Sequence, residues 1–162
     1  MERYICKPVV VCIGTSGVVG DSLGPTVGDL LIEKFDVDAF VYGRTARPVN
    51  GLNFPLYVAH VRRHHAGSVV IAVDACLGEK KDVGRVKVSV KGLRAGAALN
   101  KNWGPFGDIG VLGVVAERSS DNLSSLVHAD NNTVLSTSAL VAEKVARLVR
   151  LLRLNYSSAH TI

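Results

Sequence analysis

The stretch Val9-Val-Val-Cys-Ile-Gly14-Thr-Ser-Gly-Val-Val-Gly20-Asp-Ser-Leu-Gly-Pro25 decides the fold. Its first five residues form an uninterrupted, mostly β-branched run, which is typical of a strand buried on both faces of a sheet. A glycine-rich turn over 14–20 follows the strand. A helix is predicted from about Ser22 to Lys34, with Asp21 or Ser22 as its cap and Pro25 in its first turn. This strand–turn–helix opening predicts an α/β protein.

The rest of the chain continues the alternation of strands and helices. Further strands are predicted over 39–42, 69–73, 85–90 and 109–116, and further helices over 53–65, 121–128 and 132–154. Strands separated by helices pair in parallel through right-handed crossovers, so we expect a three-layer α/β/α sandwich with a mostly parallel sheet. Segment 85–90 follows its predecessor after a short turn, which predicts an antiparallel or edge strand. Segment 91–107 is predicted to be an irregular loop that forms a wall of the site.

Length and hydropathy indicate a single domain that does not span a membrane. The chain has 162 residues, which is close to the size of one domain, so 1–162 is predicted to fold as one unit with a polar tail from about residue 155. Its apolar runs are far shorter than the roughly 18 residues that a membrane span requires. Its start has no signal-peptide core. The three cysteines show no CxxC spacing, which fits a reducing compartment, and we expect a cytoplasmic protein.

Charge and composition narrow the range of partners. The net charge is +5, but the basic residues are mostly scattered and aromatic residues make up only 6%, so a nucleic-acid partner is disfavoured. No membrane partner is expected. The apolar face of the last helix, which carries Val141 and Val145, packs either in the core or against a second copy, and a homo-oligomer stays an open alternative.

Two aspartates are the main candidates for chemistry. Asp21 ends the turn after the first strand, and Asp74 directly follows the run Val69–Val73. If those strands are neighbours, both carboxylates project into the crevice beyond the carboxyl ends of the strands. One carboxylate of such a pair retains its proton, so the pair can activate water and protonate a leaving group. The alternatives are that the pair grips a divalent cation, or that Asp21 only caps a helix. No cofactor is predicted, since a carboxylate at Asp21 repels phosphate.

Three motifs carry a family resemblance. The segments Gly20-Asp-Ser-Leu-Gly-Pro25, Asp74-Ala-Cys-Leu77 and the glycine-rich Asn-Lys loop around Asn100 and Lys101 resemble segments of the spore germination protease family. The likeness is closer to the short YyaC-type sporulation proteins of spore-forming bacteria, over about residues 9–115. The resemblance implies a hydrogenase-maturation-protease-like, phosphorylase/hydrolase-like fold. In the germination protease, the aspartates matching Asp21 and Asp74 are held to be catalytic.

The resemblance therefore implies a sporulation-associated, aspartate-dependent peptidase acting in the forespore or the mother cell. Asp21 and Asp74 would be catalytic, whereas Gly17, Gly20, Asn100 and Lys101 would position a peptide or a small spore protein. A second hypothesis is a non-catalytic module that binds a peptide or a cation. A third is nickel-guided processing, in which Asp21 and Asp74 contact a metal; this sequence lacks the histidine that the nickel-dependent maturation proteases use.

Three further features have a structural and a functional interpretation. Cys76 lies two residues beyond Asp74, but it has no histidine beside it in the sequence, so a packed thiol is the favoured interpretation. Glu117 is either a third carboxylate at the crevice or a solvated strand end. Segment 103–106 is either an apolar lip for a peptide or a packed hinge.

Overall fold

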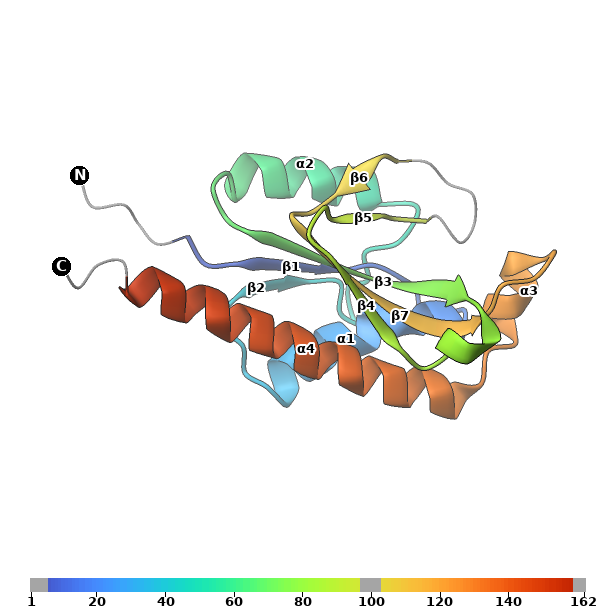
Figure 1. Ribbon diagram of the computed structural model, residues 1–162. Coiled ribbons are helices and arrows are strands. Elements are labelled where there is room, and N and C mark those ends of the chain that lie inside the picture. The colour runs from blue at the N-terminus through green and yellow to red at the C-terminus, as the bar shows by residue number, and fades with distance from the viewer. Residues whose placement is uncertain (1–5, 97–102, 159–162) are drawn as a thin grey trace.

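A five-stranded sheet forms the centre of the computed structural model, which describes residues 6–96 and 103–158 (Figure 1). Across the sheet the strands are ordered β2 (Phe40–Tyr42), β1 (Val9–Cys12), β3 (Val70–Gly78), β7 (Ile109–Glu117) and β4 (Val86–Ser89). The first four strands are parallel, and β4 pairs antiparallel with β7 at one edge. The predicted α/β class, the mostly parallel sheet and the antiparallel edge strand are confirmed.

Helices cover both faces of the sheet and complete the three layers (Figure 1). Helices α1 (Leu23–Glu33) and α4 (Asn131–Ser158) pack on one face, and α2 (Phe54–His64) covers the other. Successive side chains of a strand point to opposite faces, so β1 contributes Val10 and Cys12 to the first core cluster and Val9 and Val11 to the second. Since all of β1 is buried, its hydrophobic run is uninterrupted.

The last helix packs into the core through its apolar face. Val141 and Val145 are fully buried against the sheet, so the core interpretation of this face is correct. The helix continues to Ser158, four residues beyond the predicted end at 154, so the start of the predicted polar tail is helical. Among the described residues, no helix is long and apolar enough to cross a membrane.

Several boundaries differ from the prediction. Strand β3 continues to Gly78, because pairing with β7 extends beyond Asp74 to the end of both strands. The predicted irregular loop contains two short paired strands, β5 (Leu93–Arg94) and β6 (Pro105–Phe106). Short helices η1 (Gly20–Ser22), η2 (Lys80–Asp82) and α3 (Asn122–Val127) complete the fold.

The start of α1 also differs from the expected cap. Ser22 is the residue that precedes the helix, but its hydroxyl donates a 2.6 Å hydrogen bond back to the Val19 carbonyl. The Ser22 side chain therefore closes the preceding turn rather than capping α1.

The order of the strands places a switch point at the centre of the sheet. From β1 the chain crosses over α1 to β2 on one side, and from β2 it crosses over α2 to β3 on the other side of β1. In open α/β sheets, ligands bind where neighbouring strands diverge in this way, beyond the carboxyl ends of the strands. The segment that leaves β1 at this end carries Asp21, and Asp74 lies within β3 just beyond the last pair of β3 with β1.

Candidate active site

Close backbone contacts fix the segment that carries Asp21. The Thr15 amide donates to the Asp21 carbonyl at 3.1 Å, and the Gly14 amide donates to Val49 at 2.8 Å. Gly14 has a positive φ, and a Cβ on it would lie 2.1 Å from the Asp21 carbonyl oxygen. A Cβ on Gly24 would lie 2.0 Å from the Ile13 carbonyl oxygen. The two glycines therefore allow the glycine-rich segment 14–20 and the start of α1 to pack closely against the end of β1.

Asp74 lies inside β3, one residue beyond the last pair that this strand makes with β1, Cys12 with Val73. The side chain is buried, with 6% of the residue exposed. One carboxyl oxygen accepts a 2.9 Å hydrogen bond from the Ala75 amide, and the other accepts a longer bond, 3.4 Å, from the Gly96 amide. Beyond the pair of Cys12 with Val73, β3 has no further partner in β1.

Asp21 and Asp74 line the same small cavity of about 50 Å³. A wider cavity of about 260 Å³ shares Asp21 with it and lies over α3. The remaining residues common to both cavities are Asn50, Gly51 and Leu126. The small cavity has room for a water molecule, which needs roughly 10–15 Å³ of such space. The wider cavity has partly apolar walls that include Val18, Leu123 and Leu126.

The electrostatics of the site act mainly on Asp74. Burial raises the pKa of its carboxyl group well above the usual value, because the charged form loses hydration. The nearby charge of Asp21 raises this pKa further, and the two backbone hydrogen bonds lower it only in part. Asp74 therefore holds its proton to a higher pH than an ordinary aspartate does.

The structure brings together some of the residues predicted for the site. Asp21 and Asp74 share the cavity, whereas Gly17 is exposed and Gly20 is buried against Leu126. From the glycine-rich turn, the residues that line the two cavities are Gly14, Thr15 and Val18. Asn100 and Lys101 lie outside the described residues.

Cys76 and Glu117 fit their structural interpretations. Burial raises the pKa of the Cys76 thiol to about 11, so the thiol is protonated at neutral pH. Glu117 is exposed at the end of β7 and does not line either cavity. Trp103 combines the two roles considered for its segment, because it lines the small cavity and packs on Phe54 with ring centroids 5.0 Å apart.

Sequence reasoning did not find several residues of the cavity. Asn50 and Gly51 follow a short bridge between Ile13 and Val49, which brings this loop beside the end of β1. Leu126 comes from α3, about fifty residues beyond Asp74 in the sequence, and Gly96 follows β5. No local signal in the sequence marks Leu126 or Gly96.

The described residues offer two carboxylates to a metal and no larger set. In these parts of the chain, no group of three or more histidine, cysteine, aspartate or glutamate side chains is arranged to hold a metal ion. Asp21 and Asp74 alone would leave most positions around a divalent cation to water or to a bound ligand.

A family model described as "Protein of unknown function (DUF1256)" matches residues 2–146 of this chain. The chain belongs to the DUF1256 family. Among curated proteins, this DUF1256 chain is 35% identical over 145 residues to "Uncharacterized protein YyaC" from Bacillus subtilis (strain 168), a match that covers 88% of this chain and 70% of the relative. The predicted kinship with YyaC-type proteins is confirmed.

A solved structure shows the same fold as this DUF1256 chain. The crystal structure of the [NiFe] hydrogenase maturation protease HycI from Thermococcus kodakarensis KOD1 matches with a TM-score of 0.56 and 19% sequence identity. The match covers 89% of this chain and 93% of that structure. The predicted hydrogenase-maturation-protease-like fold is therefore confirmed, and at this identity the likeness concerns the fold.

Proposed function

We propose that this DUF1256 protein is a sporulation-associated peptidase in which Asp21 and Asp74 together hydrolyse a peptide bond of a spore protein. The observation that carries the proposal is the pairing of Asp21 with the buried Asp74, whose carboxyl pKa is raised, on one cavity at the switch point of the sheet. The fold shared with a maturation protease supports the class of activity. The motif likeness to the germination protease supports a spore protein as the substrate.

The two carboxyl groups have complementary roles in the proposed reaction. Ionised Asp21 takes a proton from a water molecule as its oxygen attacks the scissile carbonyl carbon, and Asp74 gives its proton to the carbonyl oxygen. The resulting diol collapses with cleavage of the C–N bond. Asp21 then passes its proton to the leaving amine, while a hydroxyl of the diol returns a proton to Asp74. Both carboxyl groups regain their starting states, so the pair needs no other reactant.

The two cavities suggest how the reactants are arranged. The small cavity between the aspartates has room for the attacking water. The wider cavity beside Asp21 accepts the substrate chain on its partly apolar walls. In this proposal the turn that contains Gly17 and Gly20 and the segment with Asn100 and Lys101 hold the peptide backbone.

Cleavage of a purified small acid-soluble spore protein, followed by mass spectrometry, tests the proposal. Wild type is compared with Asp21→Asn and Asp74→Asn, each with and without a chelator. Glu117→Gln is the matched control, because it neutralises an exposed carboxylate at the same end of the sheet outside both cavities. We expect each aspartate variant to lose at least about a hundredfold in rate, the scale of acid–base catalysis, and the control to retain it.

A non-catalytic peptide-binding role is the second candidate, and the near-complete burial of Asp74 favours it. Under this role, the wild-type protein binds the spore protein but leaves it intact. If the wild-type protein cleaves the substrate and a chelator abolishes this cleavage, the result would instead indicate a metal held by the two aspartates.

A further inference from the structure

A groove of about 720 Å³ lies along the outer edge of β2, and it shares no lining residue with the two cavities at the aspartates. Its walls come from β2 with the loop that follows it and from α2. The residues that matter for its chemistry are Val41, Tyr42, Arg47, Leu56, Tyr57 and His60. The function proposed for the aspartates makes no use of this groove.

The backbone of β2 is open to the groove. Strand β2 lies at the end of the sheet and pairs only with β1. The Phe40 amide donates to the Pro8 carbonyl on the β1 side at 2.9 Å. Since peptide groups of alternate residues in a parallel strand point to opposite sides, the N–H and C=O of Val41 point away from β1, along the edge that lines the groove. An edge of this kind can pair with an added strand.

The wall facing this edge comes from α2, and contacts with Tyr42 of β2 hold it in place. The Tyr42 hydroxyl lies 2.8 Å from Nε2 of His65 and 3.2 Å from Nε2 of His60, and the Tyr42 ring meets the edge of the Tyr57 ring. These contacts fix the side chains before any ligand binds. Leu56 on α2 lines the groove and is 72% exposed. The wall therefore suits an apolar side chain of an extended peptide.

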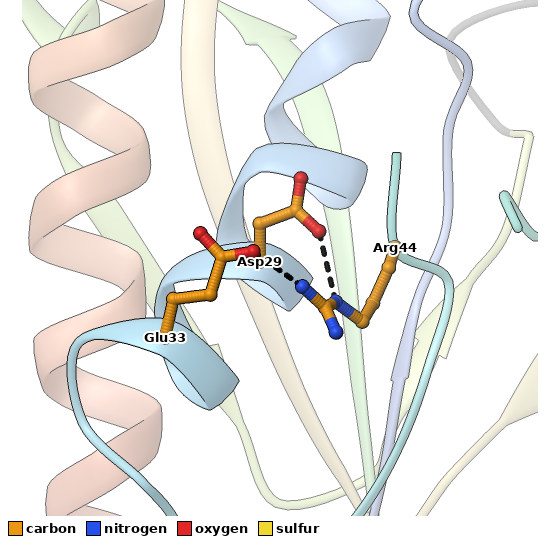
Figure 2. Close-up of polar contacts among 3 residues, drawn as sticks. All are labelled: Asp29, Glu33 and Arg44. Atoms are coloured by element: carbon orange, nitrogen blue, oxygen red, sulfur yellow. Dashed lines mark hydrogen bonds and ion pairs between the residues drawn. The ribbon is translucent and has the colours of Figure 1, made fainter. Parts of the chain in front are cut away.

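The charge of the groove is positive. Its lining includes Arg44 and Arg47 but no carboxylate. Figure 2 shows the Arg44 guanidinium turned back to α1, where it pairs with Asp29 at 2.9 Å and with Glu33. In the described parts of the chain, the exposed Arg47 side chain makes no hydrogen bond or ion pair. Arg44 thus anchors the loop, while Arg47 is available for an anionic group.

We propose that this groove binds an extended peptide segment as an added strand on β2, with a carboxylate of the peptide on Arg47 and an apolar side chain against Tyr42, Tyr57 and Leu56. The same loop continues from Arg47 to Asn50, which lines both cavities at the aspartates. The short segment from Arg47 to Asn50 therefore connects the groove to the candidate active site. The idea that the groove contacts a substrate rests on the proposed function. The binding of a peptide in the groove does not.

Binding of short synthetic peptides to the full chain tests this proposal. The probe is a fluorescent peptide of about eight residues that alternates glutamate with valine, and fluorescence polarisation reports its affinity. A lysine–valine peptide controls for charge, and a copy with N-methyl groups on alternate residues cannot complete the strand pairing. The variants are Arg47→Glu and, as the matched control, Arg63→Glu, which reverses an exposed charge in the last turn of α2 that does not line the groove. Asp74→Asn separates binding from catalysis.

We expect Arg47→Glu to weaken binding of the glutamate peptide by roughly tenfold or more, and Arg63→Glu and Asp74→Asn to leave it within about twofold. We also expect the lysine and N-methylated peptides to bind at least about tenfold more weakly. The proposal is overturned if the glutamate peptide does not bind, if N-methylation has no effect, or if the two arginine variants behave alike. It is also overturned if a single-stranded oligonucleotide, and not the peptide, binds in a manner that depends on Arg47. Loss of spore-protein cleavage alone would count only against the proposed function.

Discussion

Asp74 lies one residue beyond the last pair that β3 makes with β1, and Asp21 lies in the turn of chain that follows β1, so both carboxyl groups line the gap where β1 ends. The relationship follows from the order of the strands, because β1 sends its connection to one side and receives β3 on the other. Two acids that are 53 residues apart in the sequence thereby share one cavity, and burial together with the charge of Asp21 raises the pKa of the Asp74 carboxyl group.

The buried carboxyl group makes stability depend on pH. The folded-state pKa of Asp74 is raised by burial and by Asp21, whereas in the unfolded chain it is about 3.9. The folded state therefore binds more protons above pH ~4, and the contribution of Asp74 to stability falls as pH rises from there through the folded pKa. Asp74→Asn mimics the neutral form, so its stability relative to wild type should increase with pH. Urea unfolding over a pH series checks this, and a constant difference between the two proteins would contradict it.

A pair of glycines tests the packing that positions Asp21. Gly24→Ala places a Cβ 2.0 Å from the Ile13 carbonyl oxygen, so we expect destabilisation of about 1–3 kcal/mol despite the better helix propensity of alanine. Gly17→Ala is the matched control in the preceding turn, where the Cβ meets only the Thr15 hydroxyl at 3.7 Å. Its effect on the free energy of unfolding should stay within about 0.5 kcal/mol. Equal effects of the two variants in denaturant unfolding would be inconsistent with this packing.

The three cysteines should react at different rates. Cys6 is exposed, Cys12 is buried with a raised pKa, and burial raises the pKa of Cys76 to about 11. A thiol reagent at neutral pH should label Cys6 rapidly and the other two only slowly, because the thiolate is the reactive form. Peptide mapping of the labelled native protein gives the order, and Cys6→Ser should remove the fast phase. Fast labelling of Cys76 would contradict the burial of its thiol.

Much of the fold was predictable because the buried strands carry clear patterns. The run Val9–Ile13 contains the fully buried strand β1. The segment 85–90 contains the edge strand β4, but burial along β4 does not alternate, and Val88 is exposed. The end of β3 was not predictable, because Asp74 and Cys76 interrupt the hydrophobic run and only the partner β7 keeps the strand going. Strands β5 and β6 are two residues each, too short for any periodicity.

The candidate site was predictable in part for a related reason. Asp21 follows one strong strand signal and Asp74 interrupts another. Their place near the carboxyl end of β1 could therefore be inferred. Asn50 and Leu126 reach the cavity through long-range packing of a loop and of α3, which no local pattern reports. The family resemblance implies a binding role for Gly20, but a Cβ there would lie 3.0 Å from Leu126, so packing alone accounts for a glycine at this position.

The most direct test of the central claim, that Asp21 and Asp74 act as one coupled pair, is a titration of their carboxyl carbons by ¹³C NMR. The account predicts that Asp74 in the folded protein titrates well above the ordinary value of about 3.9, and that Asp21→Asn lowers this midpoint while burial keeps it raised. An ordinary midpoint for Asp74, or a raised one that does not respond to Asp21→Asn, would contradict the account.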